Sequence, residues 1–313
     1  MNPVLQTENL TKRFGSLVAV NNLSLEVDEG EVFGFLGPNG AGKTTSIQMM
    51  CGLLRPDSGK VLIRGKPIHD SDKQIKSRVG MCPQEIILWK NLTCLEQLEF
   101  VGKMYGLSGQ EARKSGTRLL AELDLEEKTH KLGRTLSGGM QRRLNLALAL
   151  VHDPEIVVLD EPEAGLDPQS RVKVREYIQS LAHKKTVILT THNMDEAERV
   201  ADRVAIIDHG EILVVDTPDA LKQQLGKGDV IEIELLSPGN LSQIHAGFGE
   251  ISPDLKLDLV GNHLQVRALH AVGRLAEILE LLKSADLKPG EVKIRENSLE
   301  DVFIQLTGRR LRE

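Results

Sequence analysis

Apolar and polar residues alternate along two stretches near the start of the chain, residues 4–10 and 23–27, and this pattern predicts half-exposed strands. Residues 31–36 are almost continuously apolar and predict a buried strand, which runs directly into a group of glycines. Similar apolar runs predict further strands at residues 60–63, 78–81, 156–159, 186–190 and 203–207.

Stretches with helical spacing of apolar residues lie between these runs. One covers residues 44–54, and another covers residues 92–132, a charged stretch with apolar residues three or four positions apart. Two more helices are predicted at residues 140–151 and 169–181. Because strands alternate with helices, the first two thirds of the chain are predicted to form an α/β fold with a largely parallel sheet and a helical subdomain.

The composition changes at residues 225–229, where two glycines interrupt the pattern. Beyond this point strands are predicted at residues 230–236, 255–260, 263–269 and 291–295, and an amphipathic helix at residues 271–284. The chain is therefore predicted to hold a large domain over residues 1–225, with its helical subdomain at about residues 90–135, and a small α+β C-terminal domain over residues 229–313.

The composition restricts the classes of function. With 27% charged residues and a formal net charge of −6, the surface is expected to be that of an ordinary globular protein and unsuited to broad nucleic-acid binding. Cys51, Cys82 and Cys94 lack CxxC spacing and lie in or beside apolar segments, which favours buried thiols in a reducing compartment. No apolar run reaches the roughly 18 to 20 residues of a membrane span, so a membrane role is expected to require a partner.

Residues 37–44 fit the phosphate-binding pattern G-x-x-x-x-G-K-[ST], and they lie between a predicted strand and a predicted helix. The glycines let backbone N–H groups surround phosphate oxygens, and the helix N-terminus adds the positive end of its dipole. Lys43 is expected to bind phosphate and Thr44 to bind Mg²⁺; the alternative is a glycine-rich turn whose lysine faces water. The loop consists of Gly37, Pro38, Asn39, Gly40, Ala41, Gly42, Lys43 and Thr44.

Two carboxylates, Asp160 and Glu161, directly follow the predicted strand at residues 156–159. Open α/β sheets bind ligands at the C-terminal ends of their strands. Asp160 is therefore expected to support Mg²⁺ and Glu161 to polarise an attacking water, although the same pattern also fits a strand that meets a polar turn. His192 follows the predicted strand at residues 186–190, so it should emerge at the same edge and hydrogen-bond a γ-phosphate, unless it is a structural histidine.

A second candidate phosphate-binding segment consists of Ser137, Gly138 and Gly139, between the helical region and the strand that ends at Asp160. Its two glycines expose N–H groups at the start of a predicted helix, where the dipole favours an anion. Ser137 can cap this helix or donate a hydrogen bond to phosphate. Taken alone, the segment also fits a capped helix after a turn.

The order of these features resembles the nucleotide-binding domain of ABC proteins over about residues 4–217. The resemblance rests on the 37–44 loop, Gln84, the Ser137 segment, Asp160 with Glu161, Asp167 and His192. It implies a P-loop NTPase cassette with a RecA-like parallel sheet core, an antiparallel β subdomain and a helical subdomain. It also implies ATP and Mg²⁺ as cofactors, and a head-to-tail dimer in which the loop of one cassette and the Ser137 segment of the other enclose each ATP.

The resemblance assigns further roles residue by residue. It implies that Thr45 joins the 37–44 loop in nucleotide binding and that Gln84 contacts Mg²⁺ and the membrane partner. Asp167 would communicate across the dimer. Phe14 occupies the position of the aromatic residue that stacks on adenine, although the sequence pattern around it also fits a core side chain.

Finer features resemble the drug-resistance and ABC-2 type export ATPases, namely Met140 after the two glycines, residues 165–171 and residues 297–308. In that family the tail domain follows the cassette and is thought to help hold the dimer; the alternative is a terminal helix that packs on its own domain. Glu163 departs from the pattern, because these proteins commonly carry a small or hydroxyl residue there. Its carboxylate could change the proton affinity of Glu161, alter the dimer contact, or face solvent.

These observations predict an ATP-hydrolysing subunit of an ABC export system that lies on the cytoplasmic face of a membrane. It would drive a separate transmembrane permease and pair with a second cassette, most simply as a homodimer, with no nucleic acid as partner. Lys43, Glu161 and His192 are the predicted catalytic residues. One alternative is a soluble ABC ATPase that acts on ribosomes or DNA, which the single cassette and the acidic balance disfavour. The other is an inactive nucleotide-sensing subunit, which the full set of catalytic residues disfavours.

Overall fold

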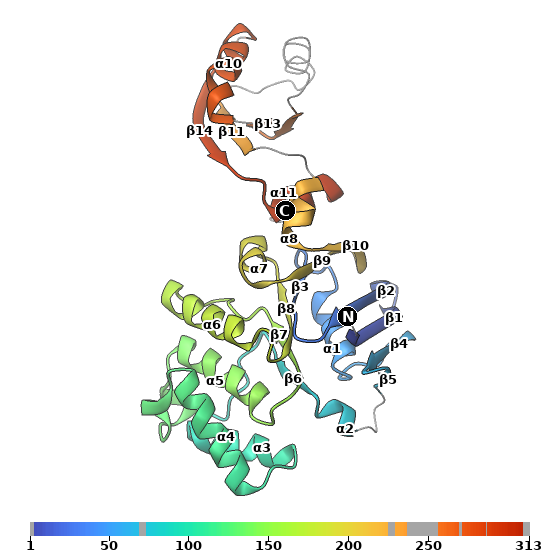
Figure 1. Ribbon diagram of the computed structural model, residues 1–313, viewed down its shortest axis with the longest axis vertical. Helices are drawn as coiled ribbons and strands as arrows, with labels where there is room; N and C mark the ends of the chain where they lie inside the picture. The colour runs from blue at the N-terminus through green and yellow to red at the C-terminus, as the bar shows by residue number, and fades with distance from the viewer. Residues whose placement is uncertain are drawn as a thin grey trace. The chain divides into compact units, whose positions relative to one another are not determined.

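The computed structural model describes residues 3–68, 73–224, 229–236, 256–268, 271–285 and 287–308. The chain folds into two compact units, Met1–Pro218 and Asp219–Arg310 (Figure 1). The composition change at residues 225–229 lies outside the described residues apart from its last position, and so do residues 255 and 269 at the ends of two predicted strands.

The first unit is built on a sheet with the strand order β10-β9-β3-β8-β7-β6. Neighbouring strands run parallel, except that β10 pairs with β9 in the antiparallel direction. The strands are β3 (Val32–Leu36), β6 (Val79–Cys82), β7 (Ile156–Asp160), β8 (Thr186–Thr191), β9 (Arg203–Asp208) and β10 (Glu211–Asp216). Parallel neighbours require crossover connections, and the helices of the sequence pattern supply them.

Both faces of this sheet are buried. In β7, Val157 and Leu159 pack into an apolar cluster with helical side chains, whereas Ile156 and Val158 pack into a second cluster on the opposite face. Successive strand residues point to opposite faces, so a strand covered on both sides needs apolar residues throughout. This is why β3 and β7 read as continuous apolar runs in the sequence rather than as alternating ones.

Helices and a second sheet cover the two faces (Figure 1). The cluster that contains Val157 includes residues of α3 (Cys94–Met104), α4 (Gly109–Glu122), α5 (Gly138–Leu150) and α6 (Pro168–Leu181). The opposite cluster includes residues of α1 (Lys43–Met50) and of an antiparallel sheet with the order β2-β1-β4-β5. Its strands are β1 (Pro3–Phe14), β2 (Leu17–Asp28), β4 (Ser58–Ile63) and β5 (Lys66–Pro67). The short helical segments are α2 (Lys73–Lys76), η1 (Glu126–Lys128), η2 (Gly133–Thr135) and α7 (Met194–Val200).

The second unit contains an antiparallel sheet with the order β12-β13-β11-β14. Apolar residues on one face of this sheet, such as Ile231 and Val266, form a core with Ile278 and Leu282 of α10. The boundary between the units falls after the first residue of α8 (Pro218–Gln224). The elements that follow are β11 (Asp229–Leu235), β12 (Lys256–Val260), β13 (His263–Ala268), α10 (Ala271–Ser284), β14 (Pro289–Arg295) and α11 (Leu299–Thr307).

The strands and helices predicted from periodicity are confirmed, with two kinds of difference. The helix predicted at residues 44–54 is shorter, because α1 ends at Met50 and Gly52 follows with a left-handed backbone, φ 65°. The short elements α2, β5, α7, β10 and α8 were not predicted from the pattern, and α11 corresponds to the terminal helix that was considered only as an alternative for the tail. The cysteines are confirmed as buried and free, and burial raises the pKa of the Cys82 and Cys94 thiols to about 11. Among the described residues, no helix combines the length and apolar character needed to cross a membrane.

Candidate nucleotide site

The sheet order brings the predicted site residues to neighbouring strand ends. In the order β3-β8-β7-β6, the segments that leave the C-terminal ends begin with Gly37, His192, Glu161 and Pro83. Because these strands are parallel, the loops emerge at the same edge of the sheet, which is where open α/β sheets bind ligands. Residues far apart in the sequence therefore lie close together.

The loop between β3 and α1 depends on glycine at two crowded positions. A Cβ atom at Gly37 would collide with the carbonyl oxygen of Ile207. Gly42 adopts φ 98°, and a Cβ there would collide with the carbonyl oxygen of Ala19. The loop is therefore held against β9 and β2, and its exposed part, Asn39 and Gly40, lies at the N-terminus of α1.

Lys43 is the first residue of α1, and its side chain turns back into the loop. Its Nζ donates hydrogen bonds to the carbonyl oxygens of Gly37 at 2.7 Å and Pro38 at 3.0 Å, and it lies 3.9 Å from Oε1 of Glu161. Burial lowers the pKa of Lys43 below its usual value, while the charges of Glu161 and Asp160 act in the opposite direction. A cation is thus held at the centre of the loop, as a phosphate site requires.

Thr44 and Asp160 form a polar pair at the same edge. The Thr44 hydroxyl donates to Oδ2 of Asp160 at 3.2 Å, and the Thr190 hydroxyl donates to Oδ1 at 2.5 Å. Among the described residues, no group of three or more His, Cys, Asp or Glu side chains could hold a metal ion by itself. A hydroxyl and one carboxylate fit Mg²⁺, which usually keeps waters and binds through one or two protein oxygens together with substrate phosphates.

Glu161 lies at the centre of the converging side chains. Its side chain is only 8% exposed, and Oε1 lies 3.0 Å from Nδ1 of His192. The Gln84 amide donates to Oε2 at 3.2 Å. Three predicted residues from separate segments of the chain, Lys43, Gln84 and His192, therefore meet around the Glu161 carboxylate.

The remaining predicted residues lie apart from this centre or at its rim. Ser137 caps α5 by accepting a hydrogen bond from the backbone N–H of Met140, and both Ser137 and Gly138 are exposed. Gly139 is packed so closely against Ser170 that a Cβ atom would clash with it. Phe14 is 50% exposed, with Nζ of Lys12 at 5.7 Å from the centre of its ring. Thr45, in the first turn of α1, is half-buried.

Glu163 does not face solvent. It is 3% exposed, and both of its oxygens accept hydrogen bonds from Arg175 of α6, at 3.0 and 2.6 Å. Of the three alternatives that the sequence left open for Glu163, a side chain that faces solvent is therefore excluded. Arg142 of α5, which the sequence pattern did not single out, is also buried and contacts the Glu161 segment. A buried charged residue gives no periodic signal of its own, so only the folded structure shows that Glu163 and Arg142 are buried and which groups they contact.

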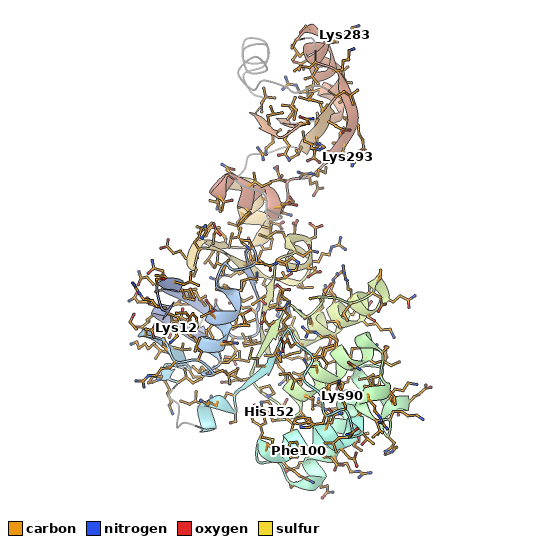
Figure 2. The ribbon with its side chains drawn as sticks, turned by 180° about the vertical axis from the view of Figure 1, so that it is seen from behind. Lys12, Lys90, Phe100, His152, Lys283 and Lys293 are labelled. Carbon is orange, nitrogen blue, oxygen red and sulfur yellow. The ribbon has the colours of Figure 1, made fainter. Side chains whose placement is uncertain are left out.

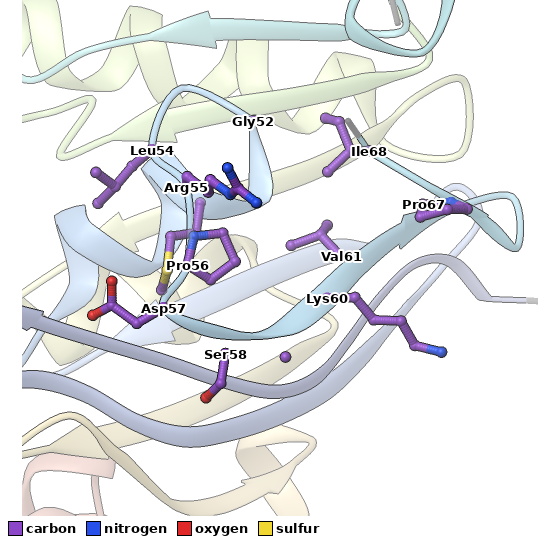
Figure 3. A pocket seen from close by; sticks show the side chains of 12 residues that line it. Gly52, Leu54, Arg55, Pro56, Asp57, Ser58, Lys60, Val61, Pro67 and Ile68 are labelled. Atoms are coloured by element: carbon purple, nitrogen blue, oxygen red, sulfur yellow. The ribbon is translucent and has the colours of Figure 1, made fainter. Parts of the chain in front are cut away.

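A hollow of about 490 Å³ lies elsewhere, between the end of α1 and β4 (Figure 3). Its lining includes Gly52, Arg55, Asp57, Lys60 and Ile68. None of the predicted site residues contributes to it. The convergence of polar groups at the strand ends, rather than the shape of this hollow, therefore identifies the candidate site.

Comparisons with known proteins agree with this location. A family model described as ABC transporter matches residues 20–164. The chain is 36% identical to the linearmycin resistance ATP-binding protein LnrL of Bacillus subtilis (strain 168), over 99% of this chain and 100% of the relative. It is 40% identical to the Nod factor export ATP-binding protein I of Burkholderia lata, over 97% of each chain.

Solved structures are similar to the cassette part of the chain. A dimeric, post-hydrolysis structure of the ATP-binding cassette MJ0796, bound to ADP and Pi, is 29% identical with a TM-score of 0.62, over 68% of this chain and 98% of that one. The structure of cbiO1 from Clostridium perfringens, part of the ABC transporter complex cbiONQ, is 28% identical with a TM-score of 0.63, over 69% and 89%. Cassettes of this family thus dimerise and work within transporter complexes. The chain therefore belongs to the ATP-binding proteins of ABC transporters, as an ATP-hydrolysing subunit of the export class.

Proposed function

We propose that this ATPase drives a separate transmembrane permease by closing two cassettes around ATP and reopening them after hydrolysis. The observation that carries the proposal is the meeting of Lys43, Gln84 and His192 around the buried carboxylate of Glu161. Phosphoryl transfer is catalysed mainly by positioning and charge neutralisation, and this arrangement supplies a cation, an amide, an imidazole and a carboxylate.

The roles of the side chains follow from their chemistry. Lys43 binds the β- and γ-phosphates of ATP, and the backbone N–H groups of residues 37–45 surround the phosphate oxygens. Glu161 polarises the attacking water, and His192 hydrogen-bonds the γ-phosphate. Mg²⁺, held by Thr44, Gln84 and Asp160, would neutralise phosphate charge. Phe14 stacks on the adenine ring, which its exposed position permits.

The second phosphate-binding segment acts across a homodimer. Ser137, Gly138 and Gly139 begin α5 and leave an exposed helix N-terminus that favours an anion. In a head-to-tail pair this segment of one chain faces the 37–44 loop of the other, and Asp167 lies beside the contact. We assign the cassette to residues 1–225 and the small domain to residues 229–313, and the division of the chain into two compact units supports two domains.

The permease contacts the helical subdomain on the cytoplasmic face of the membrane. Several apolar side chains are exposed after Gln84 and on α3: Trp89 packs edge-on against Phe100 with 5.2 Å between ring centres, and Met104 is 70% exposed. Figure 2 shows Phe100 at the end of the first unit where α3 and α4 lie. Exposed apolar groups of this kind mark protein contacts. The relatives named for resistance and export support the export direction, and the formal net charge of −6 supports the absence of a nucleic-acid partner.

Replacing Glu161 tests the proposal directly. Glu161→Gln keeps the shape of the side chain and removes its negative charge, so ATP binding is expected to persist while turnover falls by a factor on the order of 100 to 10,000. Binding is measured by equilibrium titration with ATP, and turnover by phosphate release. Asp195→Asn, at an exposed position in α7, is the matched control and is expected to keep the wild-type rate. Turnover of Glu161→Gln at the wild-type rate would contradict the proposed role.

A further inference from the structure

Arg142 is a buried cation that has carbonyl oxygens for partners. It lies in α5, is 2% exposed, and donates five hydrogen bonds to backbone oxygens within the described part of the chain. Nη1 donates to Pro83 at 2.7 Å and Gln84 at 3.0 Å. Nη2 donates to Asp160 at 2.8 Å and Glu161 at 2.7 Å, and Nε donates to Pro162 at 3.0 Å. These bonds use all five N–H donors of the guanidinium group.

Four of the five acceptors belong to two loops that are distant in the sequence, and the fifth, Asp160, is the last residue of β7. One loop follows β6 and carries Gln84; the other follows β7 and carries Glu161. The planar guanidinium fork lies between them and fixes their separation. Since Arg142 is part of the helix that Ser137 caps, the same side chain also joins both loops to α5. A single residue thus connects the three segments that hold Gln84, Glu161 and the exposed Ser137 segment.

The backbone of Glu161 requires such support. Its φ is 46°, in the left-handed region that residues with a Cβ rarely adopt. Three groups hold this conformation. The backbone N–H of Glu161 donates to both oxygens of Thr190, and its carbonyl oxygen accepts from Arg142 and from the backbone N–H of Ala164 at 3.1 Å. Strained backbone at a functional position persists only where the surroundings determine it. Among these three groups, Arg142 is the one that also contacts the Gln84 loop, so the direction of the Glu161 carboxylate depends in part on the Arg142 contact.

We propose that Arg142 is a positioning residue for ATP hydrolysis, which holds the Glu161 carboxylate and the Gln84 loop in the arrangement that turnover requires. The inference rests on the proposed role of Glu161. Arg142 acts through Glu161, so its loss lowers the rate of turnover and leaves the 37–44 loop, where ATP binds, intact. It also gives α5 a direct mechanical link to the residue that polarises the water.

The neighbouring Arg143 supplies a matched comparison. It lies in the same helix and is 7% exposed, but its Nη1 lies 3.7 Å from Asp124 and its Nε and Nη1 make no hydrogen bond within the described residues. Replacing either arginine removes a buried cation from α5. Only the replacement of Arg142 removes the contacts to the Gln84 and Glu161 loops.

The test compares Arg142→Lys, Arg142→Met and Arg143→Met with the wild-type chain. Turnover at saturating ATP is divided by the fraction of chains that bind ATP, so that loss of folded protein does not count as loss of activity. Lysine keeps the charge but offers three donors for five oxygens, so Arg142→Lys is expected to fold and to lose activity. Its kcat is expected to fall by about 10- to 100-fold, as small misplacements of reacting groups do. The Kd for ATP is expected to stay within about 3-fold, and Arg143→Met is expected to keep its kcat.

A double variant separates positioning from an independent effect. If Arg142 acts through Glu161, Arg142→Lys combined with Glu161→Gln has the same residual rate as Glu161→Gln alone. Losses that multiply, a Kd that rises in parallel with the fall in kcat, or an equal fall in Arg143→Met would each overturn the inference. An inactive Glu161→Gln beside a fully active Arg142→Lys would overturn this inference only, whereas an active Glu161→Gln would overturn the proposed function.

Discussion

Two buried carboxylates of this chain, Asp301 and Glu161, differ in the groups that contact them. Asp301 of α11 is 1% exposed, and its oxygens accept short hydrogen bonds from Arg295, at 2.6 and 2.8 Å, and from Ser298, at 2.9 Å. Glu161, in the first unit, is contacted by Gln84 and His192 at 3.2 and 3.0 Å and by Lys43 at 3.9 Å. Gln84 and His192 are both exposed, and each comes from a separate loop.

The difference separates a carboxylate that holds structure from one that is available for chemistry. Asp301 forms a capping box with Ser298 at the start of α11 and an ion pair with Arg295. Both of its oxygens therefore accept hydrogen bonds from residues that are close in the sequence. Around Glu161 the partners are side chains that can move toward a ligand. Substitutions should therefore affect stability at Asp301 and turnover at Glu161.

Asp301→Asn is expected to have the largest effect on stability. Asparagine keeps the helix cap but loses the charge opposite Arg295, and removing one member of a buried pair costs about 3 kcal/mol. Urea denaturation of the full chain measures the loss. Glu291→Gln is the control, since Glu291 forms an exposed pair with Lys293 and should cost less than about 1 kcal/mol. Turnover per folded chain is expected to stay unchanged in both.

The same pair predicts a dependence on pH. Burial raises the pKa of Asp301, but the hydrogen bonds from Arg295 and Ser298 outweigh it and hold the pKa below the usual value of 3.8. The folded pKa is depressed, so the stabilisation is fully present above pH 3.8 and is lost as the pH falls through the folded pKa. The stability difference between wild type and Asp301→Asn is therefore expected to shrink below pH 3.8, and a constant difference would contradict the pairing.

Glu163 is a third buried carboxylate, and it lies near the strand ends that carry the candidate site. It lies two positions after Glu161, yet its contacts with Arg175 resemble those of Asp301 with Arg295. Glu163→Gln is expected to cost about 2 kcal/mol of stability, less than Asp301→Asn, because Asp301 also accepts hydrogen bonds from Ser298. It is expected to change kcat by less than about 3-fold. The double variant Glu163→Gln with Arg175→Gln should recover part of the stability. A kcat loss above 10-fold would instead place Glu163 in the hydrolysis machinery.

Phe14→Ala is expected to have the smallest effect. The ring is half exposed at the end of β1, so its loss should not disturb the core. If Phe14 stacks on adenine, the Kd for ATP should rise about 5-fold while kcat stays constant. Phe14→Tyr preserves the ring and should restore affinity. An unchanged Kd in Phe14→Ala would exclude the stacking role.

The sequence pattern predicted the elements that position the site because their signals are strong. β3, β7 and β8 are buried on both faces, and this burial requires the apolar runs that were visible along the chain. The glycines at residues 37 and 42 are required by close backbone contacts, so the loop pattern is specific. Parallel pairing then fixes which strand ends are neighbours.

Other features could not be predicted, for physical reasons. α2 and α7 span only Lys73–Lys76 and Met194–Val200, too short for helical periodicity to be measured. The burial of Glu163 depends on Arg175 from a later helix, and the function inferred for Arg142 depends on carbonyl oxygens from two distant loops. Backbone oxygens leave no trace in the sequence, so a buried arginine bonded to them is indistinguishable from a solvated one.

The composite site is tested most directly by ATP turnover per chain as a function of protein concentration, for the wild type and for Ser137→Arg. Ser137 is exposed at the start of α5, so arginine there should leave folding intact and block the facing loop of a second chain. The expected result is a wild-type rate per chain that rises with concentration and a Ser137→Arg rate that stays near zero. A rate that is independent of concentration and unchanged by Ser137→Arg would contradict the shared site.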